Sequence, residues 1–160
     1  SFSFIGGRPM RLLAFGDSLT AGYVDGGDDF APWAPLLCSL LDAEAVDHIG
    51  MSGLTTGDMV ESLDEMGVLD CCYPSSSPWP GLRHQLTSKG PYDVVLIMAG
   101  TNDLAADVAP SEVLENLKTL HGVAHAAGAR SVAMSIPESK AALRHQWLKE
   151  ARTEANQAIQ

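Results

Sequence analysis

The chain has 160 residues, 46% of them hydrophobic, which suits one globular domain with a substantial core. Its formal charge is −10, from 20 acidic and 10 basic residues, which argues against nucleic acid and anionic membrane surfaces as partners. No apolar run is long enough to cross a bilayer, so we expect no integral membrane segment. The 3 cysteines show no Cys-x-x-Cys spacing, so no metal site is expected and no compartment is indicated.

Residues 1–9 follow no regular period, and we interpret them as a leader or a cloning remnant ahead of a domain that spans 10–160. The apolar run 10–15 is too short for a helix and predicts a buried strand that ends at Gly16. Asp17 and Ser18 are residue types that cap helices, so we expect a turn into a helix that carries Ser18 near its start. A hydroxyl there would lie at the carboxyl end of a strand, where open α/β sheets bind ligands. A capping role alone is the simpler alternative.

Helical and strand-like patterns then alternate along the chain. A Gly- and Asp-rich loop is expected over 21–31, and the Pro- and Ser-rich stretch 68–81 is predicted to be a surface insertion or a flap over the site. We predict helices over 33–43, 58–66, 82–89 and 111–127, a last helix from about residue 140, and strands over 44–49, 93–99 and 131–136. The first of these helices is expected to bury a stripe made of Leu36, Leu37, Leu40 and Leu41.

This alternation predicts an α/β fold with a parallel sheet covered by helices on both faces. Loops that follow three of the strands hold Ser18, Gly53 and Asn102, and parallel strands place such loops at one edge of the sheet. A serine supplies a nucleophile, a glycine lets its N–H approach a ligand closely, and an asparagine amide can donate to an oxyanion. Together these residue types describe acyl transfer, with an oxyanion hole formed by the N–H of Ser18, the N–H of Gly53 and the side chain of Asn102.

Three short motifs carry a resemblance to a known family. They are Gly16-Asp17-Ser18-Leu19-Thr20, His48-Ile49-Gly50-Met51-Ser52-Gly53 and Gly100-Thr101-Asn102-Asp103, each of which follows a predicted strand. In this order they resemble the SGNH hydrolases, also called GDSL esterases and lipases. The resemblance implies a flavodoxin-like sheet of order 2-1-3-4-5 and hydrolysis of a small ester through an acyl-enzyme on Ser18. It also implies that no metal or organic cofactor is used and that Asp17 supports the nucleophile loop.

The chain departs from the family's last motif, Asp-x-x-His, which supplies the catalytic base. No aspartate stands three residues before any of the histidines, which are His48, His84, His121, His125 and His145. The last helix is still periodic at Ile159 and has no stop signal. We therefore expect a domain that lacks its fifth strand and a final segment of ~40 residues. By itself such a chain should be a weak esterase, and the open edge of its strand 131–136 favours a homo-oligomer.

Several other residues could carry chemistry. His121 and His125 have the four-residue spacing of helical metal ligands, but a solvated helix face is the expected reading. His145 is expected to pack on its helix or face solvent, with a role as catalytic base as the alternative. His48 is expected to be a polar residue at a strand end. The aromatic residues near loops are expected to be ordinary packing rather than an acyl pocket; they are Phe30, Trp33, Tyr73 and Trp79.

Two alternative functions stay open at this point. One is a non-catalytic member of the same fold that binds an ester or a carbohydrate in the cleft. The other is a flavodoxin-like flavin or signalling domain, which is disfavoured because the first loop is not a phosphate cradle rich in Ser and Thr.

Overall fold

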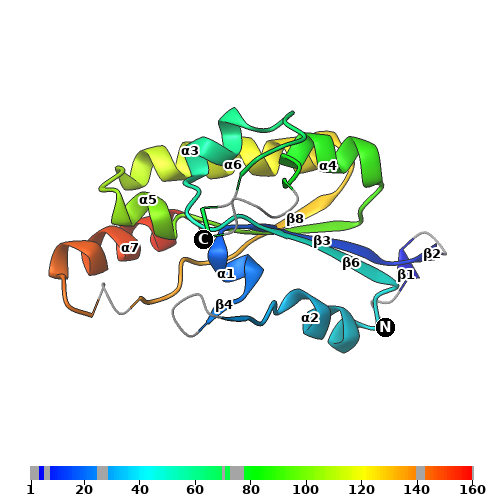
Figure 1. Cartoon of the computed structure of the whole chain (residues 1–160), viewed down its shortest axis with the longest axis horizontal. Helices are drawn as coiled ribbons and strands as arrows, with labels where there is room; N and C mark the ends of the chain where they lie inside the picture. The colour runs from blue at the N-terminus through cyan, green and yellow to red at the C-terminus, as the bar shows by residue number, and fades with distance from the viewer. Residues whose placement is uncertain are drawn as a thin grey trace.

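A four-stranded parallel sheet forms the centre of the computed structural model, which describes residues 4–5, 8–24, 29–69, 71–72, 78–139 and 143–159 (Figure 1). The strands lie in the order β6, β3, β7, β8, and neighbouring strands are parallel. Their bounds are β3 (Arg11–Gly16), β6 (Ala45–Gly50), β7 (Val94–Met98) and β8 (Arg130–Ala133). In chain order this sheet is 2-1-3-4, so the predicted fold class and the order of these strands are confirmed.

Helices cover both faces of the sheet (Figure 1). One face carries α1 (Ser18–Ala21) and α2 (Ala34–Leu41). The other carries α3 (Thr56–Glu61), α4 (Leu82–Lys89) and α6 (Pro110–Ala126). The last helix, α7 (Gln146–Ile159), packs against α6 and against the short α5 (Thr101–Ala105). No helix in the described part of the chain has the length and apolarity needed to cross a membrane.

The core has a large and a small half, one on each face of the sheet. Leu13, Phe15 and Ile97 are fully buried and point into the larger half, which the α3, α4 and α6 face covers. Leu12 and Leu96 alternate with them along the strands and point into the smaller half with Met10 and the partly buried Leu37. Because these strands are buried on both faces, their sequences are continuously apolar rather than alternating.

Helix α2 corrects one prediction. Leu36 is 64% exposed and Leu40 is 73% exposed, so the expected leucine stripe does not face the core. The helix instead packs through Ala34, which is fully buried, and through Leu37. The helices over this face are α1 and α2, and the outer side of α2 stays uncovered among the described residues.

Element boundaries and short hairpins also differ from expectation. The helix α3 ends at Glu61, which leaves Met66 exposed, and α7 begins at Gln146 rather than near 140, with 140–142 outside the described residues. Two hairpins occur where no structure was predicted: β1 (Phe4–Ile5) pairs with β2 (Arg8–Pro9), and β4 (Tyr23–Val24) pairs with β5 (Asp29–Phe30). The middle of the proposed flap lies outside the described residues, and a Val68–Trp79 bridge joins its two ends.

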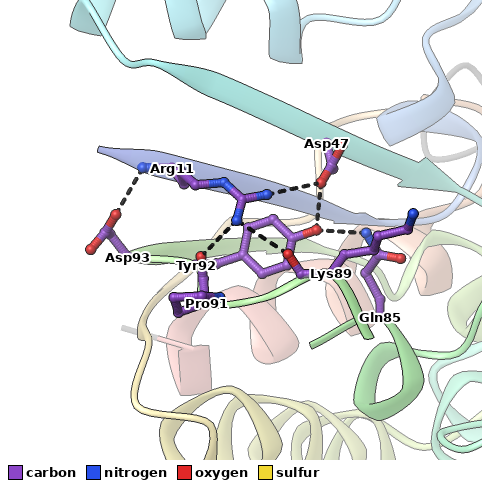
Figure 2. Close-up of polar contacts among 7 residues, drawn as sticks. All are labelled: Arg11, Asp47, Gln85, Lys89, Pro91, Tyr92 and Asp93. Carbon is purple, nitrogen blue, oxygen red and sulfur yellow. Dashed lines mark hydrogen bonds and ion pairs between the residues drawn. The ribbon is translucent and has the colours of Figure 1, made fainter. Parts of the chain in front are cut away.

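A polar network joins the elements near the amino ends of the strands (Figure 2). The Tyr92 hydroxyl donates to Asp47 Oδ2 on β6 at 2.5 Å and accepts from Gln85 Nε2 on α4 at 2.6 Å. Burial and the neighbouring Asp47 carboxylate hold the pKa of Tyr92 well above its usual value, so the phenol stays protonated. The network therefore ties β6 to α4 through one buried side chain.

Arg11, at the start of β3, extends this network (Figure 2). Its guanidinium lies 5.0 Å from the centre of the Tyr92 ring and donates to the carbonyl oxygens of Lys89 and Pro91 at 3.2 Å. Its backbone N–H donates to Asp93 Oδ2 at 2.8 Å. The first residue of the central strand is thus fixed to the segment that leads into β7.

Candidate active site

The ends of three strands lie at one level. Gly16, the last residue of β3, is in register with Gly50 on β6 and with Met98 on β7. Two backbone hydrogen bonds continue past the strands: Asp17 N–H donates to Met98 O at 3.3 Å, and Met51 N–H donates to Gly16 O at 2.8 Å. The loops that carry Ser18, Gly53 and Asn102 therefore leave the sheet from adjacent positions at its carboxyl edge.

Ser18 is the first residue of α1, as its sequence context predicts. Asp17 caps this helix, because its Oδ1 accepts a hydrogen bond from Leu19 N–H at 2.9 Å. The helix lies close to the end of β6: a Cβ at Gly50 would stand 2.1 Å from the backbone nitrogen of Ala21, so only glycine allows this approach. Ser18 is half-buried, and its hydroxyl has no hydrogen-bond partner among the described residues.

Asp17 sits in an unusual electrostatic environment for a carboxyl group. Its side chain is completely buried. Burial, together with the charge of Asp103, raises the pKa of Asp17 to about 6, while hydrogen bonds from the N–H groups of Leu19 and Thr101 act in the opposite direction. Asp17 points back into the protein to hold the loop, which leaves Ser18 as the side chain beside it that is partly open to solvent.

Gly53 lies in the loop after β6 with φ +86°, a conformation that L side chains rarely adopt. A Cβ here would also stand 2.4 Å from Cys71 Sγ, so the site excludes any side chain. The backbone of Cys71 braces the same loop by donating to Ser52 O at 3.2 Å. The residue is exposed, and among the described residues nothing accepts a hydrogen bond from its N–H.

Asn102 is the second residue of α5, and its side chain reaches across to the loop that holds Gly53. Its Nδ2 donates to Leu54 O at 2.8 Å. An amide nitrogen carries two hydrogens, so one remains for a ligand. This contact fixes the distance between two of the predicted site loops and orients the Asn102 amide.

A buried network beneath these loops was missed by the sequence analysis. Asp103 accepts hydrogen bonds from the backbone N–H of Thr56, at 2.9 and 3.0 Å to its two oxygens, and from the Thr56 hydroxyl at 2.5 Å. Asn116 on α6 donates to the same hydroxyl at 3.1 Å. Asp103 and Thr56 are both buried. The start of α3 can nevertheless be recognised in the sequence, because Thr55 and Asp58 have the spacing of a capping box. The structure contains this capping box.

The histidines lie elsewhere in the described part of the chain. His145 is exposed just ahead of α7, and its ring lies 6.4 Å from that of Trp147. His48 is half-buried on β6, and His121 and His125 both contact Ser131. No described histidine forms a hydrogen bond to the Ser18 hydroxyl. Among the described residues, no group of three or more His, Cys, Asp or Glu side chains could hold a metal ion.

The aromatic residues named as candidates lie mainly in packing contacts. Phe30 stacks edge-to-face on Tyr23 at 6.0 Å. Trp33 packs against the smaller half of the core and Trp79 against the larger one. Tyr73 falls outside the described residues. A cavity of about 180 Å³ does adjoin Asn102, between α5, the segment after β8 and α7.

Comparisons with known proteins show which family and which fold this chain is similar to. A model of the GDSL-like lipase/acylhydrolase family matches residues 14–160. The native aryl esterase of M. smegmatis has a TM-score of 0.64 and 24% identity, over 94% of this chain and 77% of that one. TesA has a TM-score of 0.63 and 22% identity, over 94% and 72%. A lipase/acylhydrolase from Enterococcus faecalis has a TM-score of 0.62 and 24% identity, over 93% and 70%. These structures share the fold, and no curated protein matches the chain.

Proposed function

Because the chain belongs to the GDSL-like lipase/acylhydrolase family, we propose that it is a serine ester hydrolase that acts through an acyl-enzyme on Ser18. The observation that carries this proposal is the register of the strand ends, which brings the loops of Ser18, Gly53 and Asn102 to one edge of the sheet. The aryl esterase and the lipase/acylhydrolase among the structural neighbours agree with it. Small esters are the proposed substrates.

The proposed reaction has two halves. Ser18 Oγ attacks the ester carbonyl while a base takes its proton, and the alcohol leaves after receiving a proton, so that the acyl group stays on Ser18. Water then cleaves this acyl-enzyme to the acid and restores the hydroxyl. In both halves the carbonyl oxygen becomes an oxyanion, for which the N–H groups of Ser18 and Gly53 and the free amide hydrogen of Asn102 are the proposed donors.

The described residues do not supply a catalytic base for Ser18. No histidine contacts Ser18, and the sequence contains no Asp-x-x-His. An alcohol is a weak nucleophile until its proton is taken. Donors and binding without the base leave ~10³–10⁴-fold catalysis over water in enzymes stripped of their catalytic residues. We therefore propose that this chain alone turns over esters slowly.

A fluorophosphonate probe tests the nucleophile directly. In a form of the protein that carries an Asp-x-x-His segment, one probe per chain should attach at Ser18, and mass spectrometry of the digested protein locates it. Ser18→Ala should abolish the labelling, while Ser39→Ala, which removes an exposed hydroxyl on α2, should leave it intact. Equal labelling of the Ser18→Ala variant would refute the assignment.

Because no described histidine forms a hydrogen bond to the Ser18 hydroxyl, a second candidate function is a module that binds an ester or a carbohydrate without cleaving it. The two functions predict different results with p-nitrophenyl acetate. A hydrolase shows weak turnover in this chain alone that is nearly insensitive to Ser18→Ala, and strong turnover when an Asp-x-x-His segment is supplied. A binding module shows ligand-dependent stabilisation in both the parent chain and Ser18→Ala, with no labelling.

A further inference from the structure

Two histidines and one serine meet between α6 and the amino end of β8. The candidate active site lies at the other, carboxyl ends of the strands. His121 Nδ1 lies 2.7 Å from Ser131 Oγ, and His125 Nε2 lies 2.7 Å from the same oxygen. The histidines are four residues apart on α6, and Ser131 is the second residue of β8. Three polar groups from two elements thus converge on one point.

The two ring nitrogens are close enough to share an ion. Since both lie 2.7 Å from one oxygen, they are at most twice that distance apart. Imidazole nitrogens bind zinc at about 2.0–2.1 Å, which requires a nitrogen–nitrogen separation of roughly 3.3–4 Å. Binding of one ion therefore requires the two rings to bring their nitrogens to this separation. His pairs at i, i+4 on one helix face are the spacing that zinc enzymes use.

The surroundings suit a metal ion as well. An open cleft of about 360 Å³ beside both histidines provides a path of entry. Lys118 lines this cleft one turn earlier, but its ammonium is paired with Glu115 at 2.7 Å, which reduces its repulsion of a cation.

We propose that His121 and His125 form a bidentate site for a divalent transition-metal ion, with the Ser131 hydroxyl or water at a further position. Imidazole ligands suit Zn²⁺, Ni²⁺ and Cu²⁺, and the expected order of affinity places Cu²⁺ first. The ion would bind in place of the hydrogen bonds to Ser131 and would stabilise the folded chain by mass action. This site is separate from the proposed esterase site and does not depend on it.

Titration of the tag-free chain with ZnCl₂, followed by calorimetry, tests the site, and the spectrum of the Cu²⁺ form reports its ligands. We expect one ion per chain and electron paramagnetic resonance features of two imidazole nitrogens. Loss of an outer-shell partner of a metal ion costs roughly 10–100-fold in affinity. His121→Ala and His125→Ala each remove a direct ligand and should weaken binding by more than this. The matched control is His145→Ala, which removes an exposed histidine outside the cluster and should leave the affinity unchanged.

Ser131→Ala separates the roles of the three groups. It should retain the two-imidazole signal and most of the affinity, because the hydroxyl is the replaceable ligand. The assignment is overturned if no ion binds at micromolar concentration, or if His145→Ala weakens binding as much as His121→Ala does. It is equally overturned if Ser131→Ala abolishes binding while both histidine variants keep it.

Discussion

Replacement of Asp17 by asparagine should stabilise the protein at neutral pH and have little effect near pH 4. Asp17 is fully buried, and burial first, with the charge of Asp103 as a further cause, raises the pKa of its carboxyl from 3.8 to about 6. A carboxyl that holds its proton more tightly in the folded state favours folding in acid and opposes it once that proton is lost. Asparagine is neutral at every pH, and its side-chain oxygen can still accept the hydrogen bond from Leu19 N–H.

The size of the effect follows from the pKa change. Below pH 3.8 both states of the parent chain are protonated, so the favourable contribution of Asp17 is fully present; it is lost as the pH rises through about 6. Each pKa unit corresponds to 1.36 kcal/mol, so the loss by pH 7 is about 3 kcal/mol. The Asp17→Asn variant avoids this loss, and its advantage should grow from near zero at pH 4 to at most about 3 kcal/mol above pH 6.

Urea unfolding followed by circular dichroism, at pH values from 4 to 8, measures this difference. Asp64→Asn provides the control, because Asp64 is exposed in an ion pair with Arg83 and its replacement should change stability by less than about 0.5 kcal/mol at any pH. If Asp17→Asn is less stable than the parent at pH 7.5, or if its advantage does not increase between pH 4 and 7, the argument from burial is wrong. Fluorophosphonate labelling of this variant should persist, because Asp17 supports the loop and takes no part in the proposed chemistry.

Three further substitutions, with Gly122→Ala as a control, probe the two ends of the sheet. In a form of the enzyme that carries a catalytic base, Asn102→Ala should lower kcat by about 10²–10³; an unchanged kcat would remove Asn102 from the oxyanion hole. Gly53→Ala should abolish the labelling, since the new Cβ would collide with Cys71 Sγ at a φ of +86°. Gly122 lies in open space on α6. Gly122→Ala should therefore keep the labelling and raise the free energy of unfolding in urea by about 0.5–1 kcal/mol. Tyr92→Phe should cost about 1–3 kcal/mol in the same assay with the labelling unchanged; equal stability would mean that its hydrogen bonds contribute nothing net.

Sequence patterns predicted β3 and β7 well, because these two strands are buried on both faces and so are continuously apolar. β6 and β8 are partly exposed, and the strand order was an implication of the family resemblance. The run 93–99 and the strand β7 differ by one residue at each end. The same patterns placed Ser18, Gly53 and Asn102 at strand ends, which the register bears out as positions, while their chemical roles stay predictions. Strand-end loops are recognisable from sequence because a polar or glycine-rich stretch follows an apolar one.

Features that depend on partners far apart in sequence were not predictable in this way. The leucines of α2 have the spacing of a buried stripe, but how much of that stripe is covered depends on what else lies over this face. Asp103 looked like turn chemistry, and its partner Thr56 stands 47 residues away. The meeting of His121 and His125 at Ser131 depends on how β8 returns along α6, which no local pattern specifies.

The network around Tyr92 and Arg11 lies near the amino ends of the strands (Figure 2), whereas Ser18 follows the carboxyl end of β3. This separation lets two kinds of selection act on one small domain without opposing each other. Sequence drift in the carboxyl-edge loops can alter which ligand is accepted, while the opposite edge keeps the strands in register. For protein engineering, cross-links or a surface attachment are accordingly best added at the amino edge. Libraries of variants are best built in the carboxyl-edge loops.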